Sequence, residues 1–213
     1  MRIRRLKEVL KEFPDFVTRV GWRLDFGGDL QNPKLGEIVR VVICRDDGTP
    51  MWDQFLHNEP IGAICVPVNK KGEIGLIIVE RPIFKNDPEF PLSDFSKLGA
   101  LSIECPRGFP FKGERSQETA ARETDEEIGS PVSESILLGH IRPNSTFHPH
   151  AIPVYLVKVD EDFQGITPPD VNEKILRVEW FTVSRVKEMI RKDEIICGIT
   201  KAALCHLFCL ADF

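Results

Sequence analysis

The chain has 213 residues, of which 42% are hydrophobic and 29% charged, and this composition suits a soluble globular protein with a buried core. Its formal net charge of −5 argues against nucleic-acid binding, and no apolar run approaches the roughly 18 residues that a membrane span needs. The six cysteines form no CxxC pair and follow no secretory signal, so we expect reduced thiols in a cytoplasmic protein.

The N-terminal part of the chain predicts one helix and two strands. Apolar residues recur at helical spacing over residues 2–13, and Pro14 ends this pattern, so we expect an amphipathic helix there. The segments 20–26 and 37–44 predict strands. The sequence between them, GGDLQNPKLG at 27–36, is typical of turns.

The rest of the chain predicts strands interleaved with helices. The runs 61–68 and 74–80 are apolar and β-branched, and the polar segment 69–73 between them indicates a hairpin. Residues 82–97 lack periodicity and predict a loop. Further strands are predicted at 98–104, 135–141, 154–159 and 175–181, and helices at 183–191 and 198–210. This order favours a mixed α/β layered domain.

One segment, ECPRGFPFKGERSQETAARETDEEIGS at 104–130, contains the residues best suited to chemistry. Ser116 is the expected N-cap of a helix, and Gly129 is placed to end that helix in a left-handed conformation. The loop ahead of the helix is rich in proline and glycine, so its backbone can bend close to a ligand. We expect one side of the helix to pack on a sheet, namely Gln117, Ala121, Thr124 and Ile128.

Three carboxylates share another face of this predicted helix. At 100° per residue, Glu123, Glu126 and Glu127 lie within an arc of about 100°. Like charges at this spacing destabilise a bare helix, whereas a hard divalent cation such as Mg²⁺ relieves the repulsion and also binds phosphates. The alternative is a charged, solvated helix face, and the three glutamates by themselves do not separate the two interpretations.

A wider pattern favours metal binding. Seven residues fall at fixed intervals, namely Gly108, Glu114, Arg122, Glu123, Glu126, Glu127 and Gly129. At roughly 7% usage for each residue type, chance gives this match on the order of 10⁻⁶ times per chain. The segment resembles the signature of the Nudix hydrolase family, G-x5-E-x7-R-E-U-x-E-E-x-G-U, in which U is a bulky aliphatic residue. It departs at both U positions, Thr124 and Ser130, which bind no metal in the family.

The resemblance implies an α/β fold, the Nudix-type α/β/α sandwich with a mixed β-sheet, over residues 59–213. Residues 1–58 form an N-terminal helix and β-region that resembles the extension of ADP-ribose pyrophosphatase-like members. Because such extensions often mediate dimerisation, we expect a homodimer.

The resemblance also implies a role for each signature residue. Glu123, Glu126 and Glu127 would bind Mg²⁺, or Mn²⁺ in its place, together with the backbone carbonyl of Arg107. Arg122 would orient Glu123 through a charge-assisted hydrogen bond. The metal would neutralise the diphosphate and lower the pKa of a bound water, which attacks one phosphorus.

The general base is assigned from a weaker resemblance. Glu173 is the first choice, and Glu161, Asp170 and Glu123 are the alternatives. For each of the loop acids, a solvated surface role is an equally good interpretation. Two roles stay open for Glu114, which either contributes to a metal through water or secures the loop.

Three further residue types outside the signature are candidates for binding. Arg81 resembles an arginine that similar enzymes place near the diphosphate, and a surface arginine is the competing interpretation. His148 and His150 favour substrate contact or surface exposure over a metal site, because no further ligand is nearby in sequence; His148 is the substrate-binding candidate. Cys205 and Cys209 lie among apolar residues and predict buried thiols rather than zinc ligands.

The leading functional hypothesis is hydrolysis of the diphosphate linkage in a small-molecule nucleotide, with ADP-ribose or another nucleotide sugar favoured. The length, the N-terminal region and Pro143 beyond the signature favour this substrate class by analogy. Nucleoside triphosphates, dinucleotides and coenzyme A stay open. The alternative from a different class is a non-catalytic Nudix-fold nucleotide sensor, but such proteins typically lose helix glutamates that this chain keeps.

Overall fold

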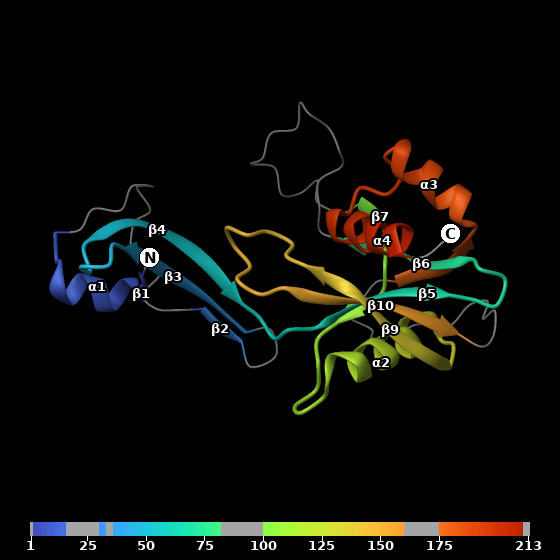
Figure 1. Cartoon of the computed structure of the whole chain (residues 1–213), viewed down its shortest axis with the longest axis horizontal. Coiled ribbons are helices and arrows are strands. Elements are labelled where there is room, and N and C mark those ends of the chain that lie inside the picture. The colour runs from blue at the N-terminus through green and yellow to red at the C-terminus, as the bar shows by residue number, and fades with distance from the viewer. Residues whose placement is uncertain (1, 16–29, 33–35, 82–99, 160–174, 211–213) are drawn as a thin grey trace. The chain divides into compact units, whose positions relative to one another are not determined.

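The computed structural model describes residues 2–15, 30–32, 36–81, 100–159 and 175–210. The chain divides into two compact units. Unit 1 comprises residues 1–61 together with 142–151, and unit 2 comprises residues 62–141 together with 152–213. Each unit contains its own β-sheet (Figure 1).

The sheet of unit 1 is built around one long strand, β3 (Gly36–Cys44). Along one edge, β3 pairs antiparallel with β4 (Pro50–Asn58). Along the other edge it pairs antiparallel with β1 (Arg2–Arg5) and β2 (Leu30–Asn32), one at each end. The other three strands are therefore all aligned by their pairing with β3.

Helix α1 (Leu6–Glu12) covers one face of this sheet. Its Val9 is fully buried and packs with Val42 and Cys44 of β3. The residues that alternate with them, including Val41, belong to a separate apolar cluster. Since alternate residues of a strand point to opposite faces, β3 has a buried apolar cluster on each face.

The predictions for unit 1 are confirmed in part. The strand predicted at 37–44 is β3, but the helix predicted at 2–13 is wrong in its first turn. Residues 2–5 pair with β3, a partner that is distant in sequence and therefore invisible to helical periodicity. The strands β2 and β4 were not predicted, and the former falls in sequence typical of turns. The predicted strand 20–26 lies outside the described residues.

The sheet of unit 2 is mixed, with the strand order β11-β6-β5-β10-β9. Its strands are β5 (Ala63–Val68), β6 (Ile74–Arg81), β7 (Ala100–Glu104), β8 (Arg107–Gly108), β9 (Val132–Ile141), β10 (Ile152–Val159) and β11 (Ile175–Phe181). β5 and β10 run parallel, whereas the other pairs are antiparallel. β7 pairs with β6, and the short β8 pairs with β5.

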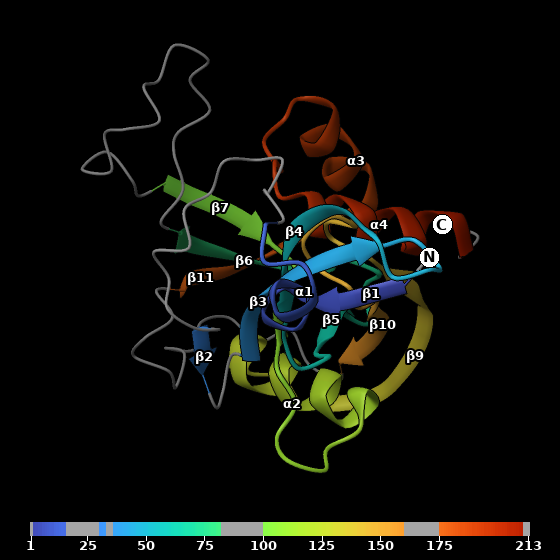
Figure 2. The same ribbon diagram turned by 90° about the vertical axis from the view of Figure 1, so that its left-hand side faces the viewer.

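Three helices cover the two faces of this sheet. They are α2 (Ser116–Ile128), α3 (Val183–Arg191) and α4 (Gly198–Leu210). Ile64 of β5 packs in a cluster with Leu204 of α4, and the next residue, Cys65, packs in a cluster with Ala120 of α2. Figures 1 and 2 show α2 on one side of the sheet and α3 and α4 on the other. The predicted α/β/α sandwich with a mixed sheet is therefore confirmed.

The predictions for unit 2 match the structure closely. The hairpin at 61–68 and 74–80 is confirmed as β5 and β6, although β5 begins at Ala63. The strand at 175–181 and both C-terminal helices have the predicted bounds. The predicted loop 82–97 lies outside the described residues. Within the described ranges, no helix has the length and apolar character needed to cross a membrane.

Candidate functional site

Helix α2 begins one residue away from the predicted cap. Arg115, rather than Ser116, holds the N-cap position, and its backbone N–H donates to the Glu118 carboxylate at 2.9 Å. The Ser116 hydroxyl instead shares a 2.8 Å hydrogen bond with the Tyr155 hydroxyl, so its prediction as N-cap is wrong. Gly129 ends the helix as predicted, in a left-handed conformation with φ of 77°.

The glutamate side of α2 faces inward. Glu123 and Glu127 are only 9% and 7% exposed. On the side that we expected to pack on the sheet, Gln117 is exposed and Ala121 is only half-buried, so that prediction is correct only in part. The small side chain of Ala120, which is fully buried, lets the helix approach the sheet closely, and this brings the neighbouring glutamates inward.

The two departures from the signature are buried positions. Thr124 and Ser130 are both 0% exposed. The Thr124 hydroxyl donates to the backbone carbonyl of Ala120 at 2.8 Å, and the Cys65 thiol donates to the same carbonyl at 3.3 Å. A backbone acceptor therefore satisfies the hydroxyl of Thr124, and the departure at this position concerns packing of the helix.

Strand β8 reaches the helix glutamates through a glycine. A Cβ at Gly108 would lie 2.1 Å from the carboxylate carbon of Glu123, so only glycine permits this approach. The adjacent backbone N–H of Arg107 donates to the Glu127 carboxylate at 3.2 Å. Pairing of Arg107 with Ile64 of β5 holds this backbone in place. The segment predicted to contribute a backbone carbonyl thus lies beside two of the predicted metal ligands.

Arg122 links three carboxylates. Its guanidinium lies 3.0 Å from Glu114, 2.8 Å from Glu123 and 2.7 Å from Glu126, and it also donates to the Phe109 carbonyl at 2.8 Å. Burial by itself lowers the pKa of Arg122, but the hydrogen bond with Glu114, followed by Glu123 and Glu126, raises that pKa above its ordinary value. The arginine is therefore a fixed positive charge, and its predicted contact with Glu123 is present.

Glu114 secures the loop ahead of the helix. Besides Arg122, its carboxylate accepts hydrogen bonds from the Phe111 backbone N–H at 2.8 Å and from the Thr119 hydroxyl at 3.1 Å. The hydrogen bond from Arg122 is the main reason that the pKa of Glu114 lies below its ordinary value. These contacts favour the second of the two roles left open for this residue.

Glu104 belongs to no motif in the sequence, yet it anchors two arginines. Its side chain is 4% exposed and accepts hydrogen bonds from Arg81 at 3.0 Å and Arg107 at 2.9 Å. Burial raises the pKa of Glu104, but Arg107 and Arg81 outweigh that effect and keep the pKa below its ordinary value. Arg81 at the end of β6 and Arg107 at the start of β8 thus share the single carboxylate of Glu104.

Several other predicted roles are not tested by the described residues of this unit. Glu173 and its alternatives Glu161 and Asp170 lie outside the described residues, so the general base stays a prediction. His148 belongs to unit 1, where its ring nitrogen lies 3.8 Å from a carboxylate oxygen of Glu59. Its role in substrate binding also stays a prediction.

The cysteines differ from what their surroundings in sequence suggested. Cys205 and Cys209 are exposed, with their sulfur atoms 3.9 Å apart, so the prediction of buried thiols is wrong for this pair. They lie one turn apart on the outer side of α4, while Leu204 and Leu207 of the same helix are buried. In contrast, Cys65 and Cys105 are fully buried, and burial raises the pKa of both thiols. These two are protonated at neutral pH and are poor nucleophiles.

An α/β/α sandwich in which a glycine of the sheet meets buried glutamates of one helix defines a recognisable class of fold and site. Residues 58–197 match the model of the NUDIX domain family. The chain therefore belongs to the Nudix family and is a Nudix pyrophosphohydrolase, whose members generally use a divalent metal.

Comparison with solved structures gives the same fold. The chain is similar to a structure described as the crystal structure of ADP compounds hydrolase, with a TM-score of 0.57. The two chains are 14% identical, and the similarity covers 84% of this chain and 88% of the other. No curated protein matches the sequence.

Proposed function

We propose that the protein hydrolyses the diphosphate linkage of a nucleoside diphosphate joined to another moiety, with Mg²⁺ as the cofactor and Mn²⁺ as a substitute. ADP-ribose or another nucleotide sugar is the favoured substrate. The observation that carries this proposal is the meeting of Gly108 with Glu123 and of the Arg107 backbone with Glu127.

The charges around α2 suit a hard divalent cation. One guanidinium, that of Arg122, is shared among Glu114, Glu123 and Glu126, while Glu127 contacts a backbone N–H. The candidate metal donors are all oxygen atoms, which Mg²⁺ and Mn²⁺ prefer. We assign Glu123 and Glu127, both nearly buried, as the principal ligands, with the half-buried Glu126 and the Arg107 carbonyl beside them.

The metal would supply charge neutralisation of the diphosphate and a water of lowered pKa. The chain itself supplies position. Arg122 holds Glu123 and Glu126 in place, and Gly108 leaves space for the Glu123 carboxylate. Phosphoryl chemistry depends mainly on such positioning and on charge stabilisation.

Arg81 is the proposed contact for the diphosphate. Glu104 holds Arg81 and Arg107 together, so two positive charges share one negative charge at this place. The excess positive charge suits an anion, and guanidinium groups bind phosphate oxygens in a bidentate manner. Glu173 remains the proposed general base, with Glu161, Asp170 and Glu123 as alternatives.

The substrate class rests on analogy. The similar solved structure is described as a hydrolase of ADP compounds, which supports a nucleotide joined through a diphosphate. We also propose that the protein is a cytoplasmic homodimer. The six cysteines are free, which supports a reducing compartment such as the cytoplasm. Size-exclusion chromatography with light scattering tests the dimer directly.

A substrate panel tests the proposed activity. The pure protein is incubated with ADP-ribose, other nucleotide sugars, dinucleotides, coenzyme A and nucleoside triphosphates, each with Mg²⁺ and with EDTA. We expect release of nucleoside monophosphate from ADP-ribose that EDTA abolishes. If the protein turns over none of these compounds but binds one of them, the non-catalytic sensor is the better account.

A further inference from the structure

Unit 1 contains a second group of metal-ligand side chains, far in sequence from the Nudix signature. The Nδ1 atom of His57 lies 3.4 Å from one carboxylate oxygen of Glu59, and the Nε2 atom of His148 lies 3.8 Å from the other. One ligand atom from each of the three residues lies within 4.8 Å of the others. All three residues belong to the same compact unit, so their arrangement does not depend on the other unit.

The segment that carries His148 is fixed against β4. The backbone N–H of His57 donates to the Phe147 carbonyl at 2.7 Å. The Phe147 ring lies against the rings of both His57 and His148, at centroid distances of 5.8 and 5.0 Å. Asn144 accepts the backbone N–H groups of Phe147 and His148 through its own carbonyl. These contacts hold the segment that carries His148 against β4.

The spacing of the three side chains suits a tetrahedral metal. Zn²⁺ binds imidazole nitrogen and carboxylate oxygen at about 2.0–2.2 Å, which places neighbouring ligand atoms about 3.4 Å apart in a tetrahedron. The distances from Glu59 to His57 and His148 are 3.4 and 3.8 Å. All three ligand atoms lie within 4.8 Å of one another, so the side chains would have to draw together to close on an ion, and a water would complete the fourth position.

The three side chains are partly shielded from solvent. The side chains of His57, Glu59 and His148 are 21%, 14% and 22% exposed, so an ion bound there is shielded but can enter from solvent.

The neighbouring histidine has a different function in the fold. The Nε2 atom of His150 hydrogen-bonds with the Asn58 amide oxygen at 2.7 Å, and the Asn58 amide donates to Glu37 at 3.2 Å. His150 therefore joins the loop to β4 without contributing to the group. The HxH pattern of the sequence is not itself the site, since the partners of His148 come from the end of β4.

We propose that His57, Glu59 and His148 bind Zn²⁺ or a chemically similar divalent ion, and that this ion fixes the 142–151 segment to the end of β4. Two imidazole nitrogens and one carboxylate select such an ion over Mg²⁺, which prefers oxygen ligands. The site is separate from the proposed magnesium site of α2 in both ligands and metal preference, and it goes beyond the proposed hydrolysis.

Zinc content tests this proposal. The full-length protein is stripped with chelator, dialysed against Zn²⁺ in the presence of excess Mg²⁺, and analysed by elemental mass spectrometry. We expect one equivalent of zinc in the unaltered protein and in His150→Ala, the matched control. His57→Ala and His148→Ala should lose it, whereas His148→Cys, which keeps a zinc ligand, should retain it. Zn²⁺ should raise Tm in the proteins that bind it and in no others.

The outcome is separable from that of the proposed hydrolysis. The double variant Glu123→Gln/Glu127→Gln should lose hydrolysis but keep its zinc, and His148→Ala should lose zinc regardless of its activity. Substitution with Co²⁺ adds a spectroscopic reading, because visible absorption bands of a two-imidazole site should vanish in His57→Ala. Equal zinc in the unaltered protein and both alanine variants, or no zinc in any of them, overturns the proposal.

Discussion

The two groups of candidate ligands differ in how the chain assembles them. Glu123, Glu126 and Glu127 lie within little more than one turn of a single helix, and Gly108, which Glu123 approaches, precedes them in the same 104–130 segment. The histidine group instead joins the end of β4 to a loop far along the chain. A local site appears in the sequence as spacing, whereas a site assembled by tertiary structure does not. The ligand chemistry also differs, because the first group has only oxygen donors, whereas the second has two imidazole nitrogens and one carboxylate.

The largest expected effect is the loss of a helix carboxylate. Glu123→Gln and Glu127→Gln each remove a negatively charged ligand from a nearly buried position. Loss of an outer-shell partner of a metal typically reduces activity about 10–100-fold, so we expect kcat to fall by more than that. Asp125→Asn, an exposed acid on the same helix, is the matched control and should keep normal kinetics. Near-normal rates in both glutamate variants would mean that Glu123 and Glu127 are not the metal ligands.

A methyl group at Gly108 should have the next largest effect. The Cβ of Gly108→Ala would lie 2.1 Å from the Glu123 carboxylate, which must then move. Displacement of a catalytic group by about 1 Å can reduce the rate roughly 100-fold, so we expect a loss of that order in kcat/KM. Gly198→Ala is the control, since its Cβ would meet nothing within 4 Å. Steady-state kinetics with circular dichroism separates a local effect from misfolding.

Arg122→Lys tests whether geometry or charge matters more. Lysine keeps the positive charge but does not reach Glu114, Glu123 and Glu126 together, because it lacks the planar guanidinium. We expect a decrease of about 10-fold in kcat, within the range for positioning partners of metal ligands. Arg115→Lys, on the exposed Arg115–Glu118 pair, should be silent. Full activity in Arg122→Lys would show that charge by itself suffices.

The smallest effect concerns stability and pH. The pKa of Glu104 is held below its ordinary value of 4.5, so its contribution to stability is present above that pH and is lost as pH falls through the folded-state pKa. Glu104→Gln should therefore destabilise the protein by about 2 kcal/mol at pH 7, and this difference should shrink below pH 4.5. Urea denaturation at several pH values measures it.

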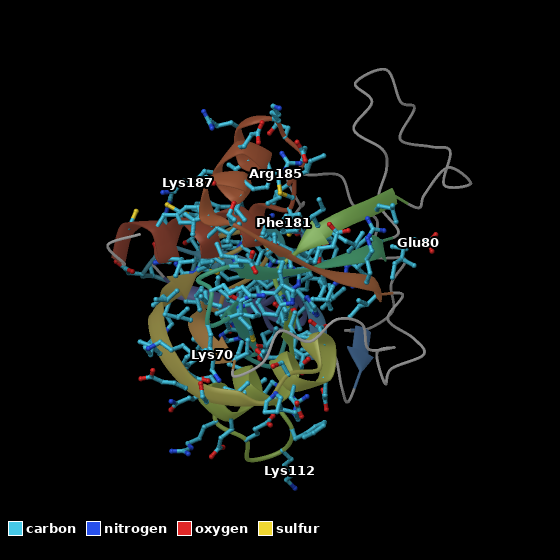
Figure 3. All side chains as sticks on the ribbon, turned by 90° about the vertical axis from the view of Figure 1, so that its right-hand side faces the viewer. Lys70, Glu80, Lys112, Phe181, Arg185 and Lys187 are labelled. Atoms are coloured by element: carbon cyan, nitrogen blue, oxygen red, sulfur yellow. The ribbon has the colours of Figure 1, made fainter. Side chains whose placement is uncertain are left out.

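The exposed Glu80, at the end of β6 (Figure 3), supplies the control for that experiment. Glu80→Gln should change stability little at any pH, because its side chain is exposed to solvent. If the loss of stability in Glu104→Gln stays constant with pH, the ionised carboxylate of Glu104 does not stabilise the protein through the two arginines.

Much of unit 2 could be predicted because its signals are local. The β5–β6 hairpin, α3 and α4 follow from short-range apolar patterns and turn residues, and Gly129 marks the end of α2. Features that depend on distant partners were missed or wrong. Residues 2–5 become a strand because β3 offers an edge, and Ser116 loses its capping role because Tyr155 of β10 uses its hydroxyl.

The same limit applies to the sites. The seven signature residues identified the helix glutamates, but Glu104 could not be recognised from its neighbours, since its partner Arg81 comes from another strand. His148 had no visible metal partner because Glu59 and His57 are distant in sequence. The exposed Cys205 and Cys209 were predicted to be buried because their neighbours in sequence are apolar. Those neighbours lie on the buried side of the helix, whereas the two cysteines lie on its exposed side.

Mn²⁺ binding measures whether the glutamates of α2 bind the metal. Mn²⁺ is titrated into metal-free protein and the free ion is followed by electron paramagnetic resonance, with Zn²⁺ present to occupy the histidine group. We expect the unaltered protein and Asp125→Asn to bind Mn²⁺, whereas Glu123→Gln/Glu127→Gln should not bind it. Equal Mn²⁺ binding by the double variant and the unaltered protein would contradict the assignment of α2 as the metal-binding element.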